Sequence, residues 1–291
     1  MSWERQVCIK SSEEIKMLRE AGIINAEALK AAAEACVPGA STWDVNAAAD
    51  AVLNKYHVVS AFKGVPGPIP YPASTCVSVN NILVHGIPSK NIVLKEGDIV
   101  SIDCGATLRG YVADSAVTVG VGKISEEAQK LIDATEGSLY EGILQMVPGN
   151  HTGDISAAIQ KFAESRGFYL TKQYTGHGVG RSMWEAPQVP NYGIAGTGLK
   201  LKAGMTIAIE PMLLIGTEDT KVMKDGWSVS SANRKYTGHY EHSIAVTENG
   251  PMITTLLENG EPPVVFNPAH KDRVLKRCEK FVTNAFLGMS E

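Results

Sequence analysis

Four carboxylates recur at matching points of two copies of one sequence pattern. Two apolar, glycine-containing segments each end in an acid, and two later segments each begin with one. These are residues 94–103 ending in Asp103, residues 201–210 ending in Glu210, residues 114–119 beginning with Asp114 and residues 241–246 beginning with Glu241. If the copies face each other, the four carboxylates share one cleft and repel strongly unless cations neutralise them. The pattern therefore predicts a metal site.

The residues around these acids favour a reactive metal site. Asp103 and Asp114 flank the turn Arg109–Gly110, which suits a hairpin that places both acids near one end. His177 lies in the glycine-rich segment 176–180 and offers an imidazole where the backbone can approach a ligand closely. One histidine with four carboxylates suits Mn, Fe, Co or Zn better than a structural zinc site does. A single acid at a strand end is more often a solvated turn residue, so the repetition carries the prediction.

The repeat also predicts the organisation of the chain. A repeat of this length indicates duplicated half-domains related by a pseudo-twofold axis. Apolar spacing and capping residues, with Thr42 and Thr152 among the caps, predict helices near residues 11–36, 42–56, 125–146 and 152–166. Strands are expected near residues 75–79, 98–107, 111–119, 205–215 and 240–246. Because no linker separates the halves, we expect one α+β domain with duplicated architecture.

Length, charge and cysteine content argue against several classes of protein. The chain has 291 residues and a formal net charge of -4, so it can bury a full core and offers no overall positive charge to nucleic acid or membrane. Its five cysteines are widely spaced, which argues against a disulfide framework. Neither a basic-then-apolar N-terminus nor an apolar run of membrane-spanning length occurs. We therefore expect a cytoplasmic protein.

Several short motifs, in their order and spacing, resemble those of the type I methionine aminopeptidases. They are residues 81–88 (NILVHGIP), residues 101–103 with 113–114, residues 175–181 (TGHGVGR), residues 209–212 (IEPM) and residues 240–242 (YEH), and the match covers residues 10–256. That family belongs to the pita-bread metallopeptidases, together with prolidase, aminopeptidase P and creatinase. The resemblance implies a pita-bread fold with a central curved antiparallel sheet and outer helices. It also implies a catalytic domain over residues 1–258 and a helical C-terminal extension over residues 259–291.

The resemblance assigns roles to the candidate residues. Two divalent ions would be bound by Asp103, Asp114, His177, Glu210 and Glu241. Asp114 and Glu241 would touch both ions, and Glu210 would accept a proton from the attacking water. His85 would contact the substrate and help to stabilise the tetrahedral intermediate or protonate the leaving amine. The pocket for the methionine side chain would include Tyr71, Cys76, Met183 and Trp227.

By the same resemblance, the chain would be an enzyme that removes the initiator methionine when the second residue is small. Its partners would be the N-termini of nascent polypeptides, including those at the ribosome. No membrane and no specific nucleic acid would be bound, and the protein would act as a monomer. His242, the neighbour of Glu241, is expected to be structural, because neighbours on a strand point to opposite faces.

Two features depart from the family pattern. Trp184 occupies the substrate-binding position where the family usually has a second histidine, and an indole donates one hydrogen bond but accepts no proton. The loop Phe62–Tyr71 is longer and richer in proline than the family pattern and would reshape the mouth of the site. Trp184 leaves open a non-catalytic homologue or one with altered specificity. A prolidase or aminopeptidase P type is disfavoured, because those peptidases usually carry a domain before the first metal-binding aspartate, here Asp103.

Overall fold

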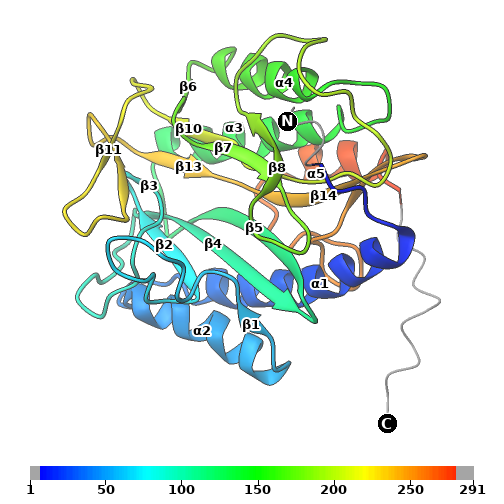
Figure 1. Ribbon diagram of the computed structural model, residues 1–291. Helices are drawn as coiled ribbons and strands as arrows, with labels where there is room; N and C mark the ends of the chain where they lie inside the picture. Colours follow the sequence, from blue (N-terminus) through cyan, green and yellow to red (C-terminus); the bar gives the residue numbers. More distant parts are fainter. Residues whose placement is uncertain (1–6, 280–291) are drawn as a thin grey trace.

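The two copies of the sequence pattern fold as two antiparallel strand pairs, each with its own helices. The computed structural model describes residues 7–279. The first half contains α1 (Ser12–Glu34), α2 (Thr42–Lys55), β4 (Ile99–Leu108) and β5 (Tyr111–Gly120), and the second half contains α3 (Glu126–Ile143), α4 (Thr152–Glu164), β9 (Thr206–Ile209) and β14 (His242–Thr247). Figure 1 shows α1 and α2 below β4, with α3 and α4 on the opposite side of the molecule. The expected α+β class with duplicated halves is confirmed.

Shorter strands complete the sheets. They are β1 (Val59–Ser60), β2 (Thr75–Val79), β3 (Ile82–Val84), β6 (Tyr169–Leu170), β7 (Thr175–Gly178), β8 (Glu185–Pro190), β10 (Met212–Leu214), β11 (Thr220–Val222), β12 (Val229–Ser231), β13 (Thr237–His239) and β15 (Gly250–Ile253). The halves adjoin where Ala116 of β5 pairs with Glu241, just before β14. Glu241 N donates to Ala116 O at 2.8 Å, and Ala116 N donates to Glu241 O at 3.2 Å. The sheets of the two halves therefore meet at Glu241, one of the predicted metal ligands.

Helix starts follow local capping chemistry. Ser11 caps α1 in a capping box with Glu14, at the start of the helix predicted near residues 11–36. The cap of α2 is Ser41 rather than the expected Thr42, because Asp44 bonds back to the backbone N–H of Ser41 at 2.8 Å. Thr152 is likewise the first helical residue of α4 and not its cap. Each correction moves a cap by one residue and leaves the helix itself in the predicted place.

The segment 205–215, expected as one strand, is divided in two. Glu210 and Pro211 separate β9 from β10, because a proline has no N–H to continue the sheet ladder. β10 then leaves the β9 sheet and pairs with β13, with Met212 opposite His239. The break therefore places Glu210 at the edge between two sheets and brings the end of β13 close to it.

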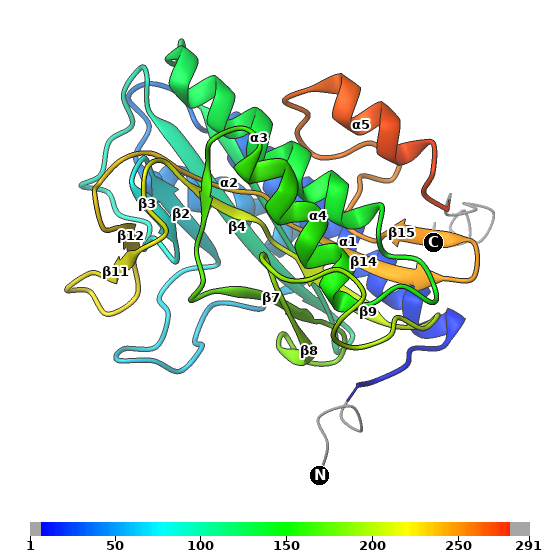
Figure 2. The ribbon, with the colours of Figure 1, turned by 90° about the horizontal axis from the view of Figure 1, so that it is seen from above.

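The C-terminal extension contains one short helix, α5 (Pro268–Leu275), in place of a long one. The expectation for residues 280–291 lies outside the described residues. The extension lies against α3, where the buried Glu136 side chain accepts hydrogen bonds from Phe266 N at 2.9 Å and Asn267 N at 2.8 Å. Figure 2 shows α5 beside α3, on the side away from β7 and β8. Among residues 7–279, no helix is long and apolar enough to cross a membrane.

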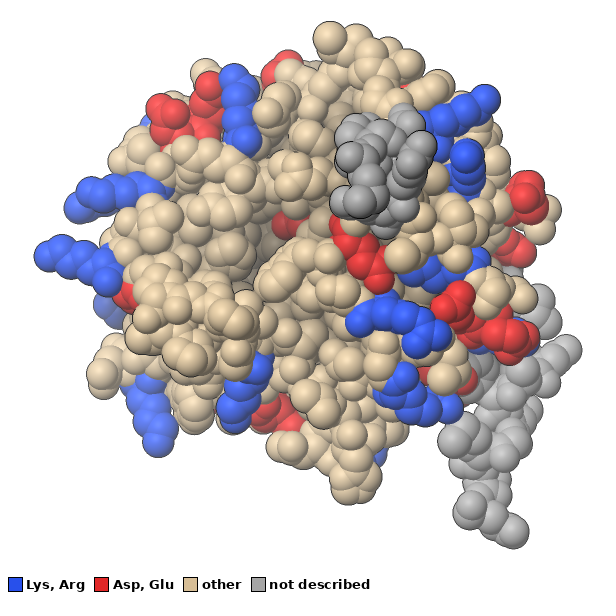
Figure 3. Space-filling view, in the orientation of Figure 1, with Lys and Arg blue, Asp and Glu red and all other residues tan. Residues whose placement is uncertain are grey.

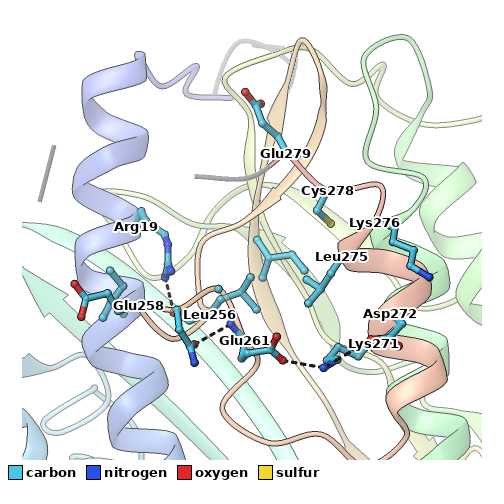
Figure 4. A pocket seen from close by; sticks show the side chains of 14 residues that line it. Arg19, Leu256, Glu258, Glu261, Lys271, Asp272, Leu275, Lys276, Cys278 and Glu279 are labelled. Atoms are coloured by element: carbon cyan, nitrogen blue, oxygen red, sulfur yellow. Dashed lines mark hydrogen bonds and ion pairs between the residues drawn. The ribbon is translucent and has the colours of Figure 1, made fainter. Parts of the chain in front are cut away.

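A cavity of about 620 Å³ lies between α1, the segment 253–261 and α5. Figure 4 shows Arg19 of α1 on one side of this cavity and Lys271 and Leu275 of α5 on the other. Lys271 donates to Glu261 at 2.9 Å across its wall. None of the candidate metal or substrate residues lines this cavity, so the reactive site has to be built elsewhere.

Candidate metal centre and adjoining pocket

The β4–β5 hairpin places Asp103 and Asp114 on one face. Asp114 lies opposite Gly105, and residues 103 and 105 point to the same side of β4. The two acids are therefore diagonal neighbours across the strand pair. Both residues of the predicted turn have positive φ, 49° at Arg109 and 81° at Gly110, which matches the tight turns that join twisted strands.

The second half supplies Glu210 and Glu241 to the same face. Glu241 is bridged to Ala116, two residues beyond Asp114 on β5. Because Ile209 pairs with His242, Glu210 follows β9 at the level of Glu241. The Asn191 side chain also donates to Glu210 O at 2.9 Å, which fixes the backbone at the point where the strand is broken.

His177 completes the cluster from β7. Its Nε2 lies 3.8 Å from Asp114 Oδ2 and 3.5 Å from Glu210 Oε1. Its Nδ1 lies 2.9 Å from Gly178 O, and a carbonyl oxygen can only accept, so Nδ1 carries the hydrogen. Burial lowers the pKa of His177, which keeps the ring neutral. The Nε2 lone pair therefore points at two carboxylates, an unfavourable arrangement that a cation between them would reverse.

The electrostatics of the cluster fit a divalent cation. Burial raises the pKa of all four carboxyl groups, and repulsion between them adds to the shift at Asp103, Glu210 and Glu241; for Asp114 the raised value is about 7. Within the described part of the chain, Asp103 Oδ1, Asp114 Oδ1 and Glu241 Oε1 are buried without a hydrogen-bond partner. Ligand atoms of Asp114, His177 and Glu241 lie within 4.8 Å of one another. These orphaned oxygens and one imidazole lone pair form a donor set for a hard or borderline metal ion.

A buried apolar cluster adjoins the carboxylates. Four of the predicted pocket residues lie in one cluster that also contains Phe62, Val112 and Ala208; they are Tyr71, Cys76, Met183 and Trp227. Cys76 of β2 pairs directly with Asp103 of β4, which places this apolar cluster beside the metal site. The Tyr71 and Trp227 rings meet edge to face at 5.1 Å, and the Tyr71 hydroxyl donates to Gly86 O at 3.0 Å.

His85 lies at the edge of this apolar cluster, against Trp227 and Tyr174. Its ring meets Trp227 edge to face at 6.4 Å and Tyr174 at 5.7 Å. Burial lowers the pKa of His85 to about 4, so the ring is neutral near pH 7 and can donate one hydrogen bond. Its backbone has φ of 60°, an uncommon conformation for a residue other than glycine. His85 therefore lies beside the predicted substrate pocket, in an unusual backbone conformation.

Trp184, the departure from the family pattern, lies outside this cluster. It is 60% exposed in the turn between β7 and β8. Glu185 holds that turn, because its Oε1 accepts from Arg181 N at 2.8 Å and Ser182 N at 3.2 Å while its other oxygen pairs with Lys10. The turn therefore presents Trp184 to solvent, and the structure does not place it with the other predicted substrate residues.

A second imidazole beside the carboxylates was not predicted. His239 of β13 is 1% exposed, and its Nε2 lies 3.7 Å from Glu210 Oε2 and 3.9 Å from Glu241 Oε2. Burial, with a smaller contribution from His85, lowers the pKa of His239 to about 3. By contrast, the Nδ1 of His242 lies 2.8 Å from the Thr255 hydroxyl and its ring stacks on Tyr140, so this residue has the structural surroundings expected for it.

The surface is hollowed on one face. Figure 3 shows a depression near the middle of this face, with acidic atoms visible inside it. A donor set of four acids and one imidazole, beside a buried apolar cluster on a duplicated antiparallel fold, is the arrangement of a metal-dependent hydrolase.

Comparison with known proteins defines the class. The family model described as metallopeptidase family M24 matches residues 16–248, and the chain belongs to that family. The methionine aminopeptidase of Clostridium acetobutylicum is 45% identical over 252 residues, covering 87% of this chain and 100% of the relative. Methionine aminopeptidase 1 of Bacillus subtilis is 43% identical over 249 residues, covering 86% and 99%.

Solved structures agree with this class. The methionine aminopeptidase of Thermotoga maritima superposes with a TM-score of 0.83 at 43% identity, covering 86% of this chain and 99% of that one. The prolidase of Pyrococcus horikoshii superposes with a TM-score of 0.68 at 24% identity and is covered to 65%, so it shares the fold alone. The predicted family, the metal-dependent hydrolase class and the fold are therefore confirmed.

Proposed function

We propose that this chain is a methionine aminopeptidase, which removes the initiator methionine from polypeptides whose second residue is small. The observation that carries the proposal is the cluster of four carboxylates and His177 directly beside a buried apolar cluster. Relatives that match nearly their whole length bear this name, which supports the same activity here.

The five predicted ligands would hold two divalent ions, with Mn, Fe, Co and Zn as the candidates. They are Asp103, Asp114, His177, Glu210 and Glu241. When bound, such ions polarise the scissile carbonyl and make an attacking water acidic. A metal ion held there would also bind the free α-amino group of a substrate. An aminopeptidase is favoured because that amine distinguishes the first residue of a chain from all later ones.

Glu210 and His85 would move and hold protons on either side of the scissile bond. Glu210 lies at the broken strand end, within the cluster, and would accept the proton of the attacking water. His85, neutral and beside the pocket, would donate a hydrogen bond to the oxyanion of the tetrahedral intermediate or pass a proton to the leaving amine.

The pocket would set the preference for methionine. Its wall is formed by Tyr71, Cys76, Met183 and Trp227, which are apolar or present apolar faces. An unbranched thioether side chain is flexible enough to fill such a pocket and gains sulfur–aromatic contacts with Tyr71 and Trp227. Because Cys76 pairs with Asp103, the first side chain of the substrate would lie next to the metal ligands.

The proposed substrates are the N-termini of nascent polypeptides in the cytoplasm, including chains still on the ribosome. We also propose that the protein acts as a monomer. The exposed basic side chains near the C-terminus, among them Lys276 and Arg277, would remain in solvent.

The proposal is tested by release of free methionine from the peptides Met-Ala-Ser and Met-Lys-Ser. The purified protein is first treated with a chelator, and Mn, Fe, Co or Zn is then added back separately. We expect cleavage of Met-Ala-Ser alone, lost on chelation and restored by at least one metal. No cleavage with any metal, by a folded protein that binds metal, would contradict the proposed activity.

A further inference from the structure

His239 is a buried imidazole with a rigid backbone. Its backbone N–H donates to the Thr118 hydroxyl oxygen at 2.9 Å, and its carbonyl oxygen accepts from the same hydroxyl at 2.8 Å. The Thr118 hydroxyl also lies 2.9 Å from that of Ser101 on β4. The first half of the molecule thereby holds a strand end of the second half in place.

The side chain of His239 points at the carboxylates without a bonded partner. Its Nε2 is buried and has no hydrogen-bond partner among residues 7–279, and Glu210 Oε2 is 3.7 Å away. The other oxygen of Glu210, Oε1, faces His177 Nε2 at 3.5 Å. Glu210 therefore lies between two imidazoles, each facing one of its oxygens.

The two imidazoles cannot have the same role toward Glu210. His177 has its hydrogen on Nδ1, because Nδ1 lies 2.9 Å from Gly178 O, and so presents a lone pair from Nε2. His239 Nε2 also faces Glu241 Oε2, at 3.9 Å. A lone pair directed at two carboxylates would be repelled, whereas an N–H would be attracted to both. The tautomer of His239 that suits its surroundings carries the hydrogen on Nε2.

We propose that His239 is the positioning residue for Glu210, donating its Nε2–H to Glu210 Oε2 so that Oε1 stays directed at His177 and the metal site. The hydrogen bond requires Glu210 and His239 to approach each other by about 0.7 Å. The inference rests on the proposed function for the role of Glu210.

The test compares His239→Leu, which removes the donor, with His239→Gln, whose amide nitrogen can reach the position of Nε2. Two readouts are used: kcat and KM on Met-Ala-Ser, and Co(II) stoichiometry and affinity by calorimetry with the visible absorption of the bound ion. For His239→Leu we expect a fall in kcat of about 10–100-fold with KM changed less than threefold, and a Co(II) affinity weakened about 10-fold at unchanged stoichiometry. His239→Gln should restore both to within about fivefold of the wild type.

His242→Gln is the matched control, because this buried histidine is close in sequence but contacts Thr255 and Tyr140 instead of Glu210. It should change stability and leave kcat unchanged.

A wild-type kcat and a wild-type Co(II) affinity in His239→Leu would overturn the inference. Loss of one bound Co(II) would also overturn it, because His239 would then be a metal ligand. If the wild type itself releases no methionine, the proposed function fails, and the Co(II) measurements on the same variants still decide the role of His239. If His239→Leu and His239→Gln both fail to fold, His239→Asn is measured instead. Its shorter side chain does not replace the Nε2–H donor, so it should bind Co(II) about 10-fold more weakly than the wild type.

Discussion

His177 has a single nitrogen left for the cluster, because the hydrogen on its Nδ1 is committed to Gly178 O. That nitrogen faces Asp114 and Glu210 at 3.8 Å and 3.5 Å. These separations are too long for hydrogen bonds and are suited to ligands that share a cation. At the residue scale, the cluster is therefore a set of mutually repelling groups whose arrangement is favourable only with positive charge between them.

Replacing Asp114 with Asn should have opposite effects on the stability of the metal-free protein and of the metal-bound protein. Burial raises the pKa of Asp114 to about 7 in the folded, metal-free protein, so folding favours its protonated form and metal-free stability falls as the pH rises from about 4 to about 7. At pH 8 the chelated Asp114→Asn protein should be more stable than the chelated wild type, by on the order of 1 kcal/mol or more. With metal present the order should reverse, because the variant lacks a ligand.

Thermal unfolding of the wild type and of Asp114→Asn at pH 8, after chelation and again with Mn or Co added, measures both differences in stability. Asp219→Asn, a change at an exposed aspartate, is the control and should leave both melting temperatures unchanged. A variant that is less stable than the wild type after chelation would show that the Asp114 carboxylate is structural without metal.

The predicted metal ligands could be read from the sequence because each acid recurs in both halves, whereas His239 could not. The position in the first half that corresponds to His239 is Val112, so no repeated imidazole draws attention to it. Only the break of the strand at Pro211, which sends β10 to pair with β13, brings His239 to Glu210. The exposure of Trp184 could not be predicted from the sequence for a similar reason, since the exposure of a turn residue depends on contacts such as that of Lys10 with Glu185.

At the scale of elements, the helices were well predicted and the short strands were not. The helices have capping residues and apolar periodicity, so α1 and α3 begin where Ser11 and Ser125 indicate. Strands such as β7 and β13 have three or four residues and contain glycine, so they show no alternation of apolar and polar residues. Their positions are determined by pairing with β9 and β10, which is information from distant parts of the chain.

The contact between α3 and the C-terminal extension should depend on pH through Glu136. Burial raises the pKa of Glu136 to about 7, against the opposing effect of the backbone N–H groups of Phe266 and Asn267. The folded state therefore binds this proton more strongly than the unfolded state does. Its contribution to stability should fall as the pH rises from about 4.5 through about 7, by up to about 3 kcal/mol.

Urea unfolding of the wild type and Glu136→Gln at pH 5 and pH 8 measures this effect. Because glutamine stays neutral, the stability of the wild type relative to the variant should be lower at pH 8 than at pH 5. Glu127→Gln, an exposed position on the same helix, provides the control. A wild-type advantage that grows with pH would mean that the ionised carboxylate is the stabilising form.

At the scale of the whole molecule, the segment after β15 ties the two halves together on the side away from β7 and β8 (Figure 2). Arg19 of α1, in the first half, donates to Thr254 O at 3.0 Å and Leu257 O at 2.6 Å. α1 also passes so close to this segment that a Cβ at Gly22 would lie 2.0 Å from Thr254 O. The extension then continues to α3 in the second half, so both halves are held by one stretch of chain.

The domain boundary at residue 258 remains a prediction, and truncation after Glu258 tests it. The predicted ligands and pocket residues all precede this point, so the shortened protein should keep kcat on Met-Ala-Ser within about threefold of the full chain at 25 °C. It loses the buried contact of Val274 and the two backbone donors to Glu136, which we expect to cost about 2–3 kcal/mol. For a chain of this size that lowers the melting temperature by about 5–10 °C. If the shortened protein unfolds cooperatively but has lost activity, residues 259–279 belong to the catalytic domain instead. The link between α1 and α3 would then be needed to keep the two carboxylate pairs in register.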